Sequence, residues 1–208
     1  MQRPAFVTIV EETPSHLEDY CTVSIAFEVS SILVPEQLDG GLSGIRMVER
    51  AIPEPYVKDY DVYAGEGPRR CASRWDLSNW GILAAYDGNR RVGGAVIARR
   101  TEGVTMLEDR EDLAVLWDFR IDHGYRRRGV GTELFKRAMD WARTNDCVEM
   151  IIETQNVNVP ACHFYASRGC QLRTIDLHAY PDLPEETKLI WRLMLNQERS
   201  GQRSIRES

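Results

Sequence analysis

A loop of seven residues combines the features of a phosphate-binding site. The run Tyr125-Arg-Arg-Arg-Gly-Val-Gly131 follows an apolar segment and precedes a helical pattern. A helix N-terminus presents unpaired N–H groups and partial positive charge, glycines let the backbone approach an anion, and arginines add charged donors. The alternative is a tight turn whose arginines are merely solvated. We expect a diphosphate site with these candidate ligands: Arg126, Arg127, Arg128, Gly129, Val130, Gly131 and Thr132.

Two other nucleotide-binding loops fit this run less well. A Rossmann dinucleotide site needs a third glycine where Leu134 stands. A P-loop needs a lysine that this run lacks.

A second segment, residues 158–169, places an asparagine and a tyrosine seven positions apart. Asn158 is also a favoured helix-capping residue, and Tyr165 is also explained as a packed ring with its hydroxyl in water. His163 has no Cys, His or Asp partner at ligand spacing, so we expect a helix-surface residue and no metal site.

The apolar run Leu113–Ile121 contains two charged residues, Asp118 and Arg120. In a strand they would face away from Trp117, Phe119 and Ile121, because side chains alternate. Two unpaired buried charges would be costly. Either Asp118 is a general base, directly or through water, or it pairs with Arg120 or another cation. Glu153, in the next apolar run, is the rival base.

The hydrophobic periodicity and the turn residues predict the secondary-structure elements around these segments. We expect an α+β layered fold with a mixed central sheet, residues 1–195 forming one domain and residues 196–208 a disordered tail. Residues 30–67 are expected to hold short helices and loops. Strands are expected at 6–10, 80–86, 92–98, 113–121, 150–154, 172–180 and 188–195, and helices from Ser15 towards Val29, at 131–143 and at 159–167.

Composition narrows the class of protein. The 208 residues carry a net charge of −6, with 43% hydrophobic and 28% charged residues, typical of a globular protein. The acidic balance argues against a nucleic-acid partner and fits a cationic substrate. No apolar run approaches the roughly 18 residues of a membrane span, and residues 1–11 do not read as a leader, so we expect a cytoplasmic protein without a membrane partner. Five dispersed cysteines indicate reduced thiols.

The two motifs together resemble those of a known superfamily. Arg126-x-x-Gly129-x-Gly131 is similar to the acetyl-coenzyme A pyrophosphate loop of the GCN5-related N-acetyltransferases (GNAT), and residues 158–169 are similar to their second motif. The resemblance covers residues 80–180. It implies the GNAT fold: α/β/α layers around a mixed, mostly antiparallel sheet splayed between its fourth and fifth strands. It also implies direct acetyl transfer from acetyl-coenzyme A to a primary amine, and it allows a homodimer.

The resemblance also implies roles for individual residues. Tyr165 would be the acid that protonates the departing thiolate. Asn158 would bond the pantetheine arm, with Ala161 beside it. The backbone around Phe119, Arg120 and Ile121 would pair with the pantetheine like an added strand, and a bulge there would aim an N–H at the carbonyl oxygen.

A narrower likeness connects the chain to streptothricin acetyltransferases. It is carried by residues 54–60, 153–158 and 161–165 and by Asp176-x-x-x-Tyr180, and it implies a small cationic acceptor. A wall of Tyr56, Tyr60, Asp61, Trp75 and Asp76 would suit such a cation, although a solvated loop over packed aromatics explains these residues equally well. A protein lysine or N-terminus as acceptor, or a non-catalytic coenzyme A sensor, remain the alternatives.

Overall fold

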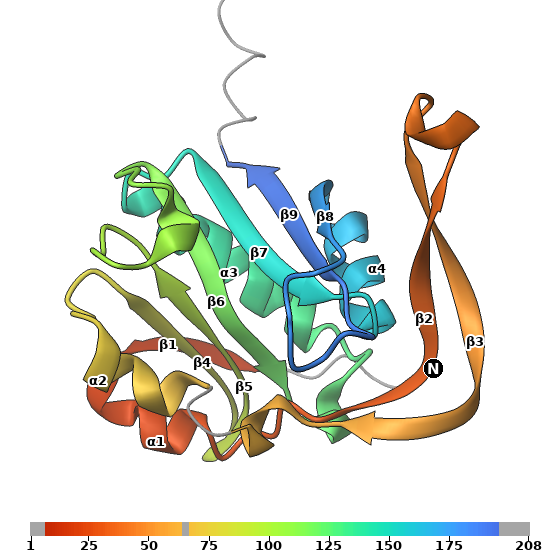
Figure 1. Ribbon diagram of the computed structural model, residues 1–208. Helices are drawn as coiled ribbons and strands as arrows, with labels where there is room; N and C mark the ends of the chain where they lie inside the picture. The colour runs from red at the N-terminus through yellow and green to blue at the C-terminus, as the bar shows by residue number, and fades with distance from the viewer. Residues whose placement is uncertain (1–6, 64–66, 196–208) are drawn as a thin grey trace, which may run out of the picture.

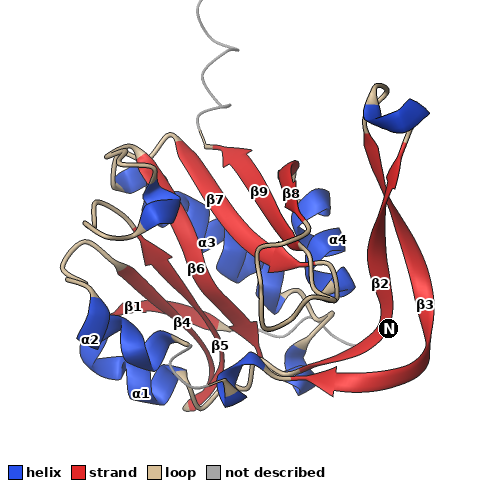
Figure 2. Ribbon diagram, in the orientation of Figure 1, coloured by secondary structure: helices blue, strands red, loops and turns tan. Residues whose placement is uncertain are grey.

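The computed structural model describes residues 7–63 and 67–195, which build one seven-stranded sheet and a separate two-stranded arm (Figures 1 and 2). The sheet has the order β1-β4-β5-β6-β7-β9-β8, and the arm is the hairpin β2-β3. The strands are β1 (Thr8–Glu12), β2 (Phe27–Gln37), β3 (Ile45–Lys58), β4 (Gly81–Asp87), β5 (Arg90–Ala98), β6 (Leu113–Ile121), β7 (Glu149–Gln155), β8 (Gln171–Asp176) and β9 (Lys188–Met194). The helices are α1 (Leu17–Tyr20), α2 (Cys71–Arg74), α3 (Val130–Thr144) and α4 (Val159–Ser167), with several single 3₁₀ turns.

Helices cover both faces of the sheet. Helices α3 and α4 pack over a core that includes Leu134, Phe135 and Met150, and α1 and α2 lie on the other face around Tyr20 and Trp80. Full burial of one such side chain contributes roughly 1.5–3 kcal/mol. The expected α+β layers and mixed sheet are confirmed: every neighbouring pair of strands is antiparallel except β6 and β7.

The sheet opens between β6 and β7. These strands pair only through residues 113–116 and 149–152 among the described residues, and beyond that point they diverge. In the order of strands expected from the sequence they are the fourth and fifth, so the expected splay is confirmed. A bulge on the other edge of β6, where Trp117 is the extra residue, adds to the bend.

One glycine on β5 controls how closely α1 approaches the sheet. A Cβ atom at Gly94 would lie 2.3 Å from Cε2 of Tyr20. Glycine therefore lets the Tyr20 ring lie directly on the strand, where the ring is fully buried. This contact places the Tyr20 hydroxyl beside Asp118.

The region from residue 15 to residue 58 differs from expectation. The helix towards Val29 and the short helices and loops after residue 30 were wrong: α1 has four residues, and β2 and β3 form a long twisted hairpin that projects from the body (orange in Figure 1). Pro35, Pro53 and Pro55 suggested loops. They are tolerated because both strands of an isolated ribbon have an outer edge without a partner strand.

Smaller differences concern the ends of the chain. The strand expected at 172–180 ends at Asp176, while 188–195 matches β9 within one residue. The tail 196–208 and Phe6 lie outside the described residues. All five cysteines are free thiols, as expected. Within residues 7–63 and 67–195, every helix is too short or too polar to span a bilayer.

Polar contacts along β2 and β3 help to attach the arm to the body. Leu33 and Asn156 exchange hydrogen bonds, from the Leu33 N–H to the Asn156 carbonyl (3.0 Å) and from the Asn156 side-chain amide to the Leu33 carbonyl (3.1 Å). His163 on α4 contacts Glu49 on β3, 3.0 Å from Nε2 to Oε2. His163 is thus a helix-surface residue, and the described residues contain no cluster of three or more potential metal ligands.

Candidate active site

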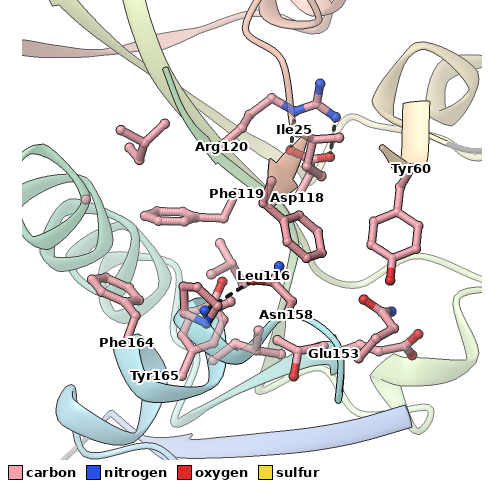
Figure 3. A pocket seen from close by; sticks show the side chains of 18 of the residues that line it. Ile25, Tyr60, Leu116, Asp118, Phe119, Arg120, Glu153, Asn158, Phe164 and Tyr165 are labelled. Carbon is pink, nitrogen blue, oxygen red and sulfur yellow. Dashed lines mark hydrogen bonds and ion pairs between the residues drawn. The ribbon is translucent and has the colours of Figure 1, made fainter. Parts of the chain in front are cut away.

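The splay of the sheet holds a cavity of about 1630 Å³ (Figure 3). It is bounded by the diverging parts of β6 and β7, the N-terminal ends of α3 and α4, the start of the arm, and the segments 60–63 and 179–186. Motifs far apart in the sequence therefore face one space, which we call the cleft.

One end of the cleft is a cradle of backbone N–H groups. The N–H groups of residues 127–132 donate to no acceptor in the described part of the chain. Arg127 (φ 58°) and Gly129 (φ 89°) adopt left-handed conformations that turn the chain into α3. Unpaired donors at the N-terminus of a fifteen-residue helix fit a diphosphate. Arg127, Gly129, Gly131 and Thr132 line the cleft at this end.

The other residues expected in this loop support it instead. Arg126 lines the cleft, but its guanidinium donates to the carbonyls of Ile121 (3.0 Å) and Ala26 (2.7 Å), and burial lowers its pKa. The Arg128 side chain lies over the Tyr125 ring, 5.0 Å from its centroid, and outside the cleft lining. The Val130 side chain is buried beneath the loop. Arg128 and Val130 can therefore contribute only backbone groups.

The middle of the cleft is lined by β6 and α4. Phe119 and Ile121 lie on the part of β6 that β7 leaves unpaired, and Ala161 faces them from α4. Asn158 caps α4: its Oδ1 accepts from the Ala161 N–H at 3.2 Å. The Asn158 amide N–H groups have no partner among the described residues, so the cap and a ligand can use different atoms of the same side chain.

Tyr165 lies deepest in this wall. The side chain is 5% exposed and packs against the rings of Phe135 and Phe164, with centroids at 5.8 and 5.4 Å. Its hydroxyl has no hydrogen-bond partner in residues 7–63 and 67–195, and the residue lines the cleft. Burial raises the pKa of Tyr165 well above its ordinary value, so the phenol keeps its proton and remains a donor.

Asp118 is fully engaged in a buried network. Its Oδ1 accepts from Tyr20 and from Nε of Arg120, and its Oδ2 accepts from Nη2 of Arg120, each at 2.7 Å. Arg120 also donates to the carboxylate of Asp61 at 2.8 and 3.1 Å. The structure therefore shows Asp118 paired with Arg120, the second of the two alternatives. The Arg120 side chain points away from the cradle of residues 127–132.

The simple alternation expected along β6 was wrong at Trp117. Phe119 and Ile121 face the α3 side of the sheet, whereas Trp117 lies on the Tyr20 side with Asp118. The cause is the bulge at Trp117, because an extra residue in a strand breaks the period of two.

Glu153, the rival base, faces the cleft from β7. The Tyr180 hydroxyl donates to its Oε1 at 2.8 Å and accepts from Nε2 of Gln155 at 3.0 Å. The Oε2 atom has no partner in the described residues. Unlike Asp118, Glu153 therefore combines an oriented carboxylate with a free oxygen.

The structure brings only part of the expected aromatic and acidic wall to the cleft. Tyr60 and Asp61 line it, but Tyr56, Trp75 and Asp76 do not. Tyr56 lies half-exposed on the arm, Trp75 stacks on Trp80 and meets Trp117 edge to face, and Asp76 accepts from the Ser78 N–H in a turn. Each is occupied by local structure that its residue type alone does not reveal.

Sequence reasoning missed two buried residues at the end of the cleft that Tyr60, Asp61 and Glu153 line. Glu186 lines the cleft, and Lys58 forms an ion pair with it. Lys58 lies within the segment 54–60 that carried the narrower likeness, which was the available signal. Glu186 sits in a polar run that looks like a solvated loop.

Comparisons with known proteins agree with this geometry. The chain matches the model of the acetyltransferase (GNAT) family over residues 46–170, more than half of its length. Streptothricin acetyltransferase A of Bacillus subtilis is 27% identical over 185 residues, which cover 88% of this chain and 97% of that protein.

Two solved structures superpose over 91% of the chain. A nourseothricin acetyltransferase does so with a TM-score of 0.70 and 19% identity, over 98% of its own chain. A Bacillus anthracis protein assigned as a streptothricin acetyltransferase, solved with acetyl coenzyme A, does so with a TM-score of 0.69 and 24% identity, over 99% of its chain. At these identities the superpositions establish the shared fold.

Proposed function

Since the chain belongs to the GNAT acetyltransferase family and is an acetyl-coenzyme A-dependent N-acetyltransferase, we propose that its acceptor is a primary amine of a small cationic molecule. A streptothricin-like antibiotic is the leading candidate, because the Bacillus subtilis relative that matches most of the chain is named streptothricin acetyltransferase A. The end of the cleft that is lined by Tyr60, Asp61, Glu153 and Glu186, here called the acceptor end, independently supports a cationic acceptor.

The observation that carries the proposal is the charge of that end. The carboxylates of Asp61, Asp118, Glu153 and Glu186 line it. Arg120 pairs with Asp61 and Asp118, and Lys58 pairs with Glu186, so these carboxylates exceed the cations that contact them. An ammonium entering this end meets carboxylates and tyrosine rings. Opposite charge within a few ångströms strengthens binding most where water is excluded.

The residues of the cleft can divide the reaction between them. Bound acetyl-coenzyme A supplies a thioester whose carbonyl carbon the amine attacks. The N–H cradle of residues 127–132 would hold the diphosphate, and the unpaired edge of β6 beyond the bulge would pair with the pantetheine and offer an N–H to the carbonyl oxygen.

Proton transfer is assigned to Glu153 and Tyr165. Glu153 uses its free oxygen to accept a proton from the ammonium, directly or through water, and Tyr165 gives its proton to the departing thiolate. The second proton that the attacking nitrogen loses restores the Tyr165 phenol, and the proton on Glu153 passes to solvent. Burial raises the pKa of Tyr165, so the phenol is in its protonated form when the reaction starts. Asp118, held by Tyr20 and Arg120, then has a structural role.

The test is the release of free thiol from acetyl-coenzyme A with a panel of amines: streptothricin, lysine, spermidine, an aminoglycoside and a lysine peptide. Turnover with streptothricin, abolished by Tyr165→Phe, is the expected result. Turnover with the peptide alone would replace the small acceptor by a protein. No turnover with any amine, despite binding of acetyl-coenzyme A, would contradict the proposal and favour a sensor.

A further inference from the structure

A buried ion pair that no catalytic step uses lies behind the acceptor end. Lys58, the last residue of β3, and Glu186, just before β9, form an ion pair with side chains 8% and 0% exposed. We propose that Lys58 and Glu186 are positioning residues that orient the Tyr60 hydroxyl, so that the Tyr60 oxygen presents a hydrogen-bond acceptor, and not a donor, to the acceptor amine. The inference rests on the proposed function and names the chemistry of its amine site.

The pair has partners for its other polar atoms. Lys58 Nζ donates to the Tyr63 hydroxyl at 2.9 Å and lies 5.0 Å from the centroids of the Tyr60 and Tyr63 rings. Burial opposes the charged form of Lys58, but hydrogen bonds to Glu186 and Tyr63 outweigh it and raise its pKa. Lys58 therefore stays charged beside the Glu186 carboxylate.

Glu186 in turn fixes the proton of Tyr60. The Tyr60 hydroxyl donates to Oε2 of Glu186 at 2.6 Å. A phenol has one proton, so the Tyr60 oxygen can then only accept from a ligand. Burial and the neighbouring carboxylate raise the pKa of Tyr60 far above its ordinary value, so the phenol stays neutral. Phe27 packs against its ring, with centroids 6.1 Å apart.

The opposite wall is built in the same way. Tyr180 donates to Oε1 of Glu153, and its own oxygen is used by Gln155. Figure 3 shows the Tyr60 hydroxyl on the side of the pocket where Glu153 lies. Two tyrosine–glutamate pairs thus commit both phenolic protons to carboxylates. The Tyr60 oxygen and Oε2 of Glu153 remain as acceptors, a pattern that matches an ammonium and rejects groups that need a donor.

Stability alone gives little reason for such a pair. Replacing a buried ion pair by apolar side chains of similar size is often neutral or stabilising. The pair joins residues 128 positions apart in sequence (186 minus 58), and its hydrogen bonds run to two tyrosines that line the cleft, Tyr60 and Tyr63. A role in orienting Tyr60 accounts for both the charge and the position.

Calorimetric titration of streptothricin into the coenzyme A-loaded full chain separates this role from turnover. We expect Tyr60→Phe and Glu186→Gln to weaken binding about 10- to 100-fold, the loss of one charge-linked hydrogen bond, and to leave coenzyme A affinity unchanged. In turnover, the KM for the amine rises more than kcat falls. The matched control is Tyr86→Phe, which removes a hydroxyl bonded to Glu12 outside the cleft.

A double variant guards against simple misfolding. Lys58→Met with Glu186→Leu removes both charges, should retain the melting temperature, and should weaken amine binding as Tyr60→Phe does. Unchanged streptothricin affinity in Tyr60→Phe or in the folded double variant overturns the positioning role, even if turnover proves the proposed function right. If the wild-type chain turns over no amine, the proposed function is overturned instead. The titration measures binding without turnover, so the two failures can be told apart.

Discussion

Asp118 and Arg120 form a two-point ion pair on one face of β6, with both N–O distances at 2.7 Å. The pair is buried, and the hydroxyl of Tyr20 on α1 donates a hydrogen bond to Asp118. Both oxygens of Asp118 therefore already accept hydrogen bonds, three in all, whereas Oε2 of Glu153 has no partner in the described residues. This arrangement separates the two carboxylates that the sequence left as rival bases.

Asp118→Asn should therefore act on stability before catalysis. Breaking a buried pair costs about 3–5 kcal/mol of unfolding free energy, and the lower end applies because Asp61 still contacts Arg120. Urea unfolding measures the loss. Glu36→Gln, which breaks exposed pairs with Arg46 and Arg50, is the control and should change the unfolding free energy far less, because solvent screens exposed pairs. A large drop in kcat without lost stability would restore Asp118 as the base.

Glu153→Gln should lower kcat/KM for the amine by roughly 10²–10⁴-fold at neutral pH, the usual contribution of a general base. The deficit should shrink as the pH approaches the amine's own pKa, about 10.4 for a lysine-like group, because the free amine then needs no base. A pH–rate profile of both proteins measures this. The control is Glu149→Gln on the same strand, whose partners are Arg110 and Arg192. A deficit that stays constant with pH would contradict the assignment.

Tyr165→Phe should reduce kcat by about 10²-fold or more while the Kd for acetyl-coenzyme A stays within a factor of two. The ring and its packing against Phe135 and Phe164 are kept, and only the proton donor is lost. Because the pKa of Tyr165 is raised, wild-type kcat should not fall at the ordinary tyrosine pKa of about 10. Stopped-flow turnover and equilibrium dialysis measure the two quantities, and a weakened Kd with unchanged kcat would assign Tyr165 to binding.

Arg127→Ala should raise the KM for acetyl-coenzyme A about tenfold and leave the KM for the amine unchanged. Arg127 lines the cradle end of the cleft, where a phosphate would accept from its guanidinium. The effect should shrink at high salt, which screens such contacts. Arg128→Ala is the matched control, since that side chain lies over Tyr125 outside the cleft. Equal effects of the two variants would place the phosphate elsewhere.

Stability should also fall in mild alkali. Burial raises the pKa of the Cys162 thiol to about 11, while an unfolded thiol ionises near pH ~8.5. A raised folded-state pKa stabilises the native state fully below the unfolded value, and that stability is lost as the pH rises from about 8.5 through about 11. Urea unfolding between these limits measures the slope, and Cys162→Ala should reduce it. An identical slope in the variant would show that other groups dominate.

Sequence patterns were sufficient to predict the elements that carry the cleft. The runs that became β6 and α4 were placed to the residue, and α3 within one residue at each end. A continuous apolar run identifies β6, a helical period identifies α3, and Asn158 and Pro160 mark the start of α4. The arm was missed for a local reason: prolines and glycines that end elements inside a sheet are harmless in a lone ribbon.

The partners across the cleft could not be read from the sequence. Tyr20 and Asp118 are 98 positions apart, and Lys58 and Glu186 are 128 apart. Each residue alone resembles a core tyrosine or a solvated charge. Only the tertiary contact, made possible at Gly94 for the first pair, gives them a role.

The splay between β6 and β7 also divides the sheet mechanically. Strands β1, β4, β5 and β6 form one antiparallel block and β7, β9 and β8 another, joined by a seam of four residue pairs. A pantetheine arm lying along the unpaired edge of β6 would extend that seam beyond Leu116. The bound cofactor would then join the two halves of the sheet. The same few residues would therefore determine both how cooperatively the sheet unfolds and whether the cleft is occupied.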